Sequence, residues 1–291
     1  MGERSGKVSM LDLEWPRSGA AVMCLALVAA SLPAQETSPP PAAGGDLRSA
    51  VQNPVGDLIS LPVETTFDFG APDGGATFVN LQPVVPIDVG AFNIVTRTIV
   101  PIIDAPGSIT GLPGNPDPIP GPRKFGLGDI NLSLFASPKK AGEVIFGVGP
   151  AIGLPTATSD ILGSGKWNIG PSFVVLTQPK PWTLGILAGN LWSFAGDSDR
   201  QNIKQFIAQP FISYNLAKGW FLTSSPMITA NWSASGSQRW LVPVGGGFGR
   251  LVSLGSQPMQ LMLQGFYNVA KPDGAPNWAL RFTIQALFPK K

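Results

Sequence analysis

In the final eleven residues before the C-terminal tail, every second side chain is apolar, from Trp278 to Phe288. The positions between them are Ala279, Arg281, Thr283, Gln285 and Leu287. Successive side chains of a β-strand point to opposite faces, so one face is apolar along its whole length and the other is mostly polar. The length matches the roughly 9–11 residues of a tilted strand that crosses a bilayer. This pattern predicts a strand of a transmembrane β-barrel, with the edge strand of a soluble β-sandwich as the alternative.

Extended segments of this kind recur from residue 60 onward, and no long stretch has a helical period. The candidate strands cover residues 65–69, 79–87, 93–103, 126–136, 144–154, 166–176, 182–194, 203–214, 220–232, 239–252, 259–269 and 278–288. We therefore predict an all-β fold, a single antiparallel transmembrane barrel of about 12 strands, an even number as such barrels require. Because residues 166–176 and 239–252 alternate poorly, the count is open by two.

The connections and the prolines add detail to this prediction. Short connections alternate with longer ones, as the periplasmic turns and outer loops of barrels do. The longest, residues 107–124, is too rich in Pro and Gly for a helix, and it either folds inward as a constriction or stays outside. Prolines within the candidate strands each delete a ladder hydrogen bond, so they predict bulges or local breaks in the wall. These prolines are Pro83, Pro101, Pro150, Pro171, Pro210 and Pro243.

The N-terminal region has the pattern of an export signal. Basic residues precede an apolar run at 20–30 that is too short to span a membrane as a helix, and a small-residue cleavage site follows it. We predict a signal peptide over residues 1–34, a linker and short periplasmic segment over 35–59, and an outer-membrane barrel over 60–291. Residues 46–59 are expected to form a short amphipathic turn or helix that lies at the periplasmic mouth or plugs it. An uncleaved anchor is the alternative to the signal peptide.

Several classes of chemistry are disfavoured by the composition. The chain has no histidine, which removes the usual Ser-His-Asp, Cys-His and His metal sites. The formal net charge is only +2, which does not favour a nucleic-acid partner. We predict that the chain is not an enzyme and has no catalytic residues, no cofactor and no metal. The expected partners are outer-membrane lipid, the barrel-assembly machinery and a small solute that the sequence does not identify.

Polar positions within the alternating segments are the candidates for lining a lumen. A charged side chain on the lipid face near the midplane costs about 2–4 kcal/mol, so Arg97 and Arg281 are expected to face inward. The full candidate set is Gln82, Arg97, Asp129, Asn131, Asn190, Arg239, Arg281 and Gln285. These side chains either select a solute or pair across the lumen and plug it, and the sequence favours neither.

From about Gln52 onward the chain resembles the outer-membrane family named after the meta-pathway of phenol degradation. The matching stretches are QNPVGDLISLP (52–62), FGLGDINLSLFASPKK (125–140), GVGPAIGLPTATSDILGSGKWNIGP (147–171), GNLWSFAGD (189–197), QPFISYNL (209–216) and NWALRFTIQALFPK (277–290). The resemblance implies an outer-membrane barrel that passes small, aromatic or hydrophobic molecules. The alternatives are a structural or adhesive barrel with a plugged lumen, and a soluble periplasmic β-sandwich.

Overall fold

The computed structural model describes residues 47–140 and 142–289. The predicted signal peptide and residues 35–46 of the predicted linker lie outside the described residues. The elements in chain order are α2 (Leu47–Val51), β1 (Ile59–Phe69), β2 (Ala76–Leu81), β3 (Val84–Val89), β4 (Phe92–Ala105), β5 (Lys124–Leu127), β6 (Ile130–Pro138), β7 (Val144–Leu154), β8 (Lys166–Thr177), β9 (Trp182–Gly196), β10 (Lys204–Asn215), η1 (Ala217–Gly219), β11 (Trp220–Ser224), β12 (Ile228–Asn231), η2 (Gly236–Gln238), β13 (Trp240–Leu254), β14 (Gln257–Ala270) and β15 (Trp278–Phe288).

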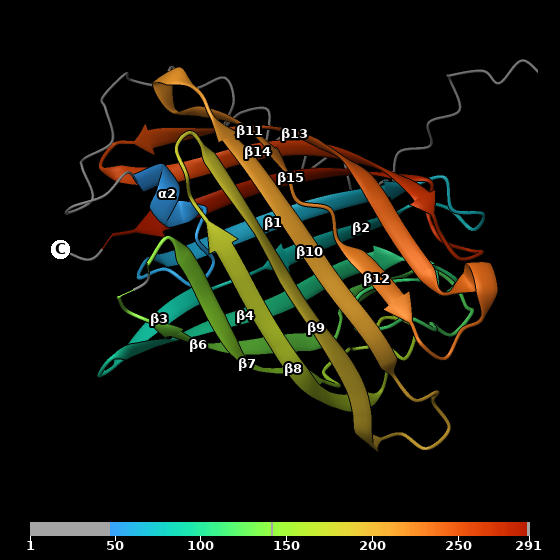
Figure 1. Cartoon of the computed structure of the whole chain (residues 1–291). Coiled ribbons are helices and arrows are strands. Elements are labelled where there is room, and N and C mark those ends of the chain that lie inside the picture. The colour runs from blue at the N-terminus through green and yellow to red at the C-terminus, as the bar shows by residue number, and fades with distance from the viewer. Residues whose placement is uncertain (1–46, 141, 290–291) are drawn as a thin grey trace, which may run out of the picture.

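The strands form one antiparallel sheet that closes on itself as a barrel (Figure 1). The seam is the pairing of β1 with β15, which runs from Ile59 opposite Phe288 to Phe69 opposite Trp278. Three crossings of the wall are split into two pieces each, as β2 with β3, β5 with β6, and β11 with β12. When each split crossing is counted as one strand, the barrel wall has 12 strands. The predicted barrel is confirmed, and the closing strand pairs back to the first.

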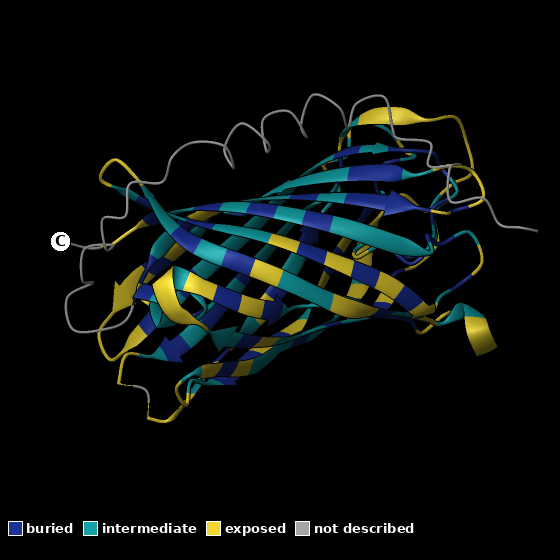
Figure 2. Cartoon of the chain, turned by 90° about the horizontal axis from the view of Figure 1, so that it is seen from above, coloured by how far each residue is buried: buried dark blue, intermediate teal, exposed yellow. Residues whose placement is uncertain are grey.

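The outer face of the barrel is a band of exposed apolar side chains. Val148, Phe173, Leu222 and Phe248 are all exposed on alternate positions of their strands. Figure 2 shows the resulting alternation of exposed and buried residues along several strands. An apolar surface of this extent requires an apolar environment, and the outer face of a transmembrane barrel lies against lipid.

Aromatic side chains lie near the two ends of this band. Trp232 and Trp240 meet edge-to-face at one end, with ring centroids 5.8 Å apart. At the opposite end Trp182 meets Tyr214 at 4.7 Å in the same manner. Aromatic rings with a polar N–H or O–H favour the interface between hydrocarbon and water, so this arrangement is that of an aromatic girdle.

Across the described residues, no helix combines the length and the hydropathy needed to cross a membrane.

Two of the three wall breaks coincide with proline. Pro83 separates β2 from β3, and Pro226 lies between β11 and β12. Beside the second break, β13 shifts register between Val242 and Pro243. Proline has no N–H to donate to the ladder, so each of these prolines removes a pairing hydrogen bond at its break. In contrast, Pro150 and Pro171 face each other within strands that continue unbroken.

The interior of the barrel contains an apolar cluster near each of its two ends. At the end where β1 begins, Val55 packs with Val95, Phe135 and Val174. At the other end, a second apolar cluster includes Ile109, which is buried. Residues 55 and 109 belong to segments outside the wall. The described chain therefore places its apolar cores between the wall and segments that fold into it.

Candidate functional site

A group of polar side chains lies on the inner face where β1, β14 and β15 run side by side. Gln264 on β14 is opposite Arg281 on β15, and Arg281 is opposite Thr66 on β1. Glu64 lies two residues before Thr66 and therefore on the same face. Gln264 and Arg281 are both buried. The strict alternation of these three strands is what brings the polar groups together inside the wall.

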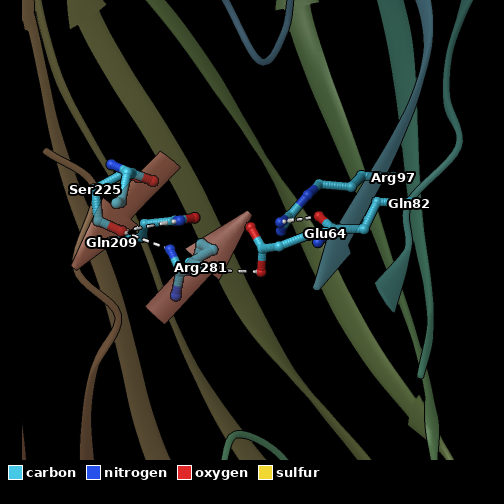
Figure 3. A network of polar contacts seen from close by, with 7 residues as sticks. Glu64, Gln82, Arg97, Gln209, Ser225 and Arg281 are labelled. Carbon is cyan, nitrogen blue, oxygen red and sulfur yellow. Dashed lines mark hydrogen bonds and ion pairs between the residues drawn. The ribbon is translucent and has the colours of Figure 1, made fainter. Parts of the chain in front are cut away.

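Glu64 lies between two arginine side chains, as Figure 3 shows. Its Oε1 is 3.6 Å from Nε of Arg281. On its other side, Nη2 of Arg97 donates to Oε1 of Gln82 at 2.7 Å. The side chains of Arg281 and Glu64 are only 10% and 16% exposed. Because bulk water is largely excluded, the attraction between these charges is stronger than between the same charges on a surface.

Arg281 also holds the wall break between β11 and β12. Its Nη1 donates to the carbonyl oxygen of Ser225 at 3.0 Å, and Nε2 of Gln209 reaches the same oxygen at 3.5 Å. The Ser225 hydroxyl donates to Oε1 of Gln264 at 3.1 Å. Side chains thus satisfy a backbone carbonyl that the interrupted ladder leaves free. Together with Gln82, which lies at the β2–β3 break, the network joins two weak points of the wall.

An aromatic ring lies beside the same arginine. The guanidinium carbon of Arg281 is 5.0 Å from the ring centroid of Phe266, which is buried on the inner face of β14. A cation over an aromatic face is attracted by the ring quadrupole, most strongly where water is excluded. The centre of the barrel therefore presents charge, hydrogen-bonding groups and an apolar ring within one small region.

The connection between β4 and β5, residues 106–123, folds into the outer end of the barrel. Gln205, on the inner face of β10, makes two hydrogen bonds to it. Its Oε1 accepts from the Gly114 N–H at 2.7 Å, and its Nε2 donates to the Leu112 carbonyl at 2.9 Å. The longest loop therefore folds inward, which is one of the two conformations expected from the sequence.

Two further side chains of β12 fasten this loop. Thr229 donates from Oγ1 to the Gly111 carbonyl at 2.8 Å. Asn231 donates from Nδ2 to Oδ2 of Asp117 at 2.8 Å. Both side chains are buried. The outer closure, defined here as residues 106–123, is therefore held by polar contacts to the inner wall and by the apolar cluster around Ile109.

The segment before β1 closes the opposite end. Figure 1 shows α2 at the end of the barrel where β1 begins. Leu47 of α2 packs with Leu251 and Leu287 from the inner wall. Gln52 donates to Oδ1 of Asn215 at 3.1 Å and accepts from the Thr183 hydroxyl at 2.7 Å. We call residues 47–58 the inner closure.

The eight predicted lumen residues divide into two groups. Gln82, Arg97 and Arg281 belong to the central network described above. Gln285 is buried on the inner face of β15 and accepts from Nε2 of Gln260 at 3.1 Å. Asn131 lies on β6 opposite Gly153, on the same face as the buried Ser133. These five face inward, and the four that lie on strands do so as the alternation of their strands predicts.

The other three lie away from the centre. Asp129, at the β5–β6 break, accepts from the Ser164 N–H and hydroxyl at 2.7 Å each. Arg239, just before β13, donates from Nε to the Ala234 carbonyl at 3.1 Å. Both residues order connections at the outer end. They do not join the central network.

The inward placement predicted for Asn190 is wrong. Its Oδ1 accepts from Nε1 of Trp232 at 2.6 Å, and it borders an apolar groove with the exposed Phe173. The inner positions of β9 are instead taken by Leu187 and Leu191, which pack on apolar clusters inside the barrel. Where the inner face of a strand is apolar, a polar side chain does not indicate which face points inward.

Sequence reasoning missed several residues of the site. Glu64 alternates with the apolar positions of β1, so the sequence indicates that its side chain faces inward. It is not among the predicted lumen residues. Gln264 and Phe266 lie in a segment predicted as a strand without an assigned face. Ser225 takes part through its backbone carbonyl, and no side-chain pattern reports that.

The described part of the chain has no group of three or more His, Cys, Asp or Glu side chains placed to hold a metal ion. The groups that converge are guanidinium, amide, hydroxyl and carboxylate. Such groups bind a solute by charge and by hydrogen bonds.

Residues 55–284 match the model of the protein family described as "Putative MetA-pathway of phenol degradation". The chain belongs to this family. Its fold is similar to that of an outer membrane channel from Pseudomonas putida F1, with a TM-score of 0.55 and 12% identity over 80% of this chain and 96% of that chain. At 12% identity, the similarity shows that the two chains share a fold.

Two other solved structures are less similar. LpxR from Salmonella typhimurium has a TM-score of 0.42 and 10% identity, covering 79% of this chain and 100% of that chain. CdiB from Acinetobacter baumannii has a TM-score of 0.39 and 10% identity, covering 79% and 60%. TM-scores this low support no inference about this chain. No curated protein matches the chain.

Proposed function

We propose that this member of the phenol-degradation family is an outer-membrane channel that passes small molecules through a polar-lined lumen. The observation that carries the proposal is the construction of the two closures. Both the outer closure and the inner closure are segments outside the wall, held by side-chain contacts and not by strand pairing. Either segment can leave the lumen without breaking the ladder that closes the barrel.

Other features support the proposal. The family match and the fold likeness to a channel favour transport over catalysis, and the apolar outer band favours a lipid environment. The ring of Phe266 within the polar centre favours solutes that combine an aromatic ring with a polar group. We further propose export by a signal peptide at residues 1–34 and insertion into the outer membrane by the barrel-assembly machinery.

Reconstitution in planar bilayers tests the channel. Folded protein, verified by heat-modifiable gel mobility, should conduct ions, and liposomes that contain it should swell in phenol-sized aromatic solutes. Arg48 in the inner closure donates from Nη1 to the Leu216 carbonyl at 2.7 Å. A variant with Arg48→Ala and Gln52→Ala removes this contact and those of Gln52, and it should conduct more often. Lys139→Ala is the matched control, because Lys139 pairs with Asp88 outside both closures. Folded protein without conductance or solute flux, in the wild type and in the variant, refutes the proposal.

The alternative is a structural or adhesive barrel whose lumen stays plugged. It is favoured by one observation, the apolar packing of Val55 with Val95 and Phe135 inside the barrel. Under this alternative, loosening the inner closure would lower stability without opening a path. The same bilayer experiment separates the two, because only a channel gains conductance from the double variant.

A further inference from the structure

Three hydrogen-bond donors at the centre of the barrel have no acceptor. They are Nε of Arg281, Nε2 of Gln264 and the hydroxyl of Thr283, each enclosed and without a hydrogen-bond partner among the described residues. Gln264 and Arg281 are direct partners across β14 and β15, and Thr283 lies two residues further on the same face. Buried donors without a partner are uncommon in folded proteins, because each one costs free energy. Their clustering points to an acceptor supplied from outside the chain.

The contact between Arg281 and Glu64 does not fill this role. At 3.6 Å it is an ion pair without a hydrogen bond from Nε, and the same carboxylate also faces Arg97 (Figure 3). The Glu64 carboxylate is therefore shared between two guanidinium groups. A charge-assisted bond between arginine and carboxylate is normally shorter, at about 2.7–2.9 Å, and often uses two N–H groups. Arg281 thus retains capacity for a second anion.

We propose that the centre of the barrel is a binding site for small aromatic carboxylates. The carboxylate offers acceptors to Arg281, Gln264 and Thr283, since an ionised carboxyl group accepts hydrogen bonds and donates none. Phe266, beside the Arg281 guanidinium, supplies an apolar surface for the aromatic ring of the solute. The proposal rests on the proposed channel function and names its substrate class.

Glu64 has a defined part in this site. It occupies the space between the two arginines with the same functional group that the solute carries. A bound carboxylate therefore competes with Glu64 for Arg281, which keeps the binding weak enough for the solute to leave. Moderate affinity of this kind is what passage through a selective pore requires.

Equilibrium dialysis with labelled benzoate tests the site in detergent-solubilised full-length protein, over times long enough for the closures to open. Wild-type protein should bind benzoate more tightly than benzamide, which lacks the charge, and more tightly than cyclohexanecarboxylate, which lacks the aromatic ring. Arg281→Gln should weaken benzoate binding about tenfold or more, because a charge-assisted contact is lost. Glu64→Gln should strengthen it, because the competing carboxylate becomes a neutral isostere.

Arg239→Gln is the matched control, since Arg239 lies in an outer connection and not in the central network. It should leave benzoate binding unchanged. Arg281→Lys keeps the charge and should retain part of the affinity, which separates loss of the site from loss of the fold. Equal binding of benzoate and benzamide, or an Arg281→Gln variant that is folded and binds normally, overturns the proposal.

The two proposals fail in different ways. Dialysis measures binding without flux, and ion conductance measures flux without benzoate. A protein that conducts but does not bind benzoate keeps the channel and loses the carboxylate site. A protein that binds benzoate but never conducts keeps the site and loses the channel.

Discussion

Replacing Gln205 with methionine should loosen the outer closure. Gln205 has no exposed surface and makes two hydrogen bonds to residues 106–123, one to Gly114 and one to Leu112. Methionine keeps the length of the side chain but removes the amide oxygen and the amide N–H group that make these two bonds. Each lost bond leaves a polar backbone group unsatisfied, at about 1–1.5 kcal/mol. The closed form should therefore lose about 2–3 kcal/mol, which raises the ratio of open to closed loops about 30–150-fold.

Thiol labelling measures this ratio directly. The chain has one cysteine, Cys24, so a Cys24→Ala background allows a single reporter to be placed at Ile109→Cys. Ile109 is 1% exposed in the closed loop, so a maleimide reagent reaches the reporter only when the loop opens. The labelling rate should rise by the same factor as the open population, because the reaction samples a pre-equilibrium.

Gln209→Met is the control for this prediction. Gln209 lies on the same strand and face but contacts Ser225 and not the loop. It should leave labelling at position 109 unchanged. Equal labelling rates in the wild type and in the Gln205→Met variant would show that the two hydrogen bonds do not hold the closure.

Three further predictions follow from the wall and its connections. Phe248→Arg places a charge on the lipid face near mid-strand and should lower the unfolding free energy by about 2–4 kcal/mol, against about 0–1 kcal/mol for Leu254→Arg at the strand end, measured by denaturant titration in liposomes. Asp129→Ala should speed proteolysis of residues 155–165, because Ser164 loses its acceptor, whereas Asp160→Ala should not; equal rates would contradict the role of Asp129. Phe135→Ala should cost about 3–5 kcal/mol in the same titration, since Phe135 is fully buried inside the barrel.

The fold was predictable wherever the two faces of a strand meet different environments. In β15 one face meets lipid and the other meets the polar centre, so apolar and polar side chains alternate from Leu280 to Ala286 and Arg281 marks the inner side. The same logic predicted the inward direction of Arg97. The physical cost of a charge in lipid is large enough to fix these positions.

The pattern fails where segments fold into the barrel. Inner positions such as Leu187 are then apolar because they pack on those segments, and Asn190 lies outside. Ser225 joins the site through a backbone carbonyl, which any residue type provides. The inward fold of residues 106–123 depends on Gln205 and on partners far away in the sequence, so no local pattern predicts it.

The seam between β1 and β15 has a consequence for assembly. These two strands are at opposite ends of the barrel sequence and pair along their whole length. Until residues 278–288 have been delivered, one edge of β1 has unsatisfied N–H and C=O groups that lipid does not accept. The earliest strand to emerge therefore waits longest for its second neighbour, and the rate of closure depends on a contact between distant parts of the chain. A chain that ends before Trp278 would present two open edges to the membrane and could not complete its insertion.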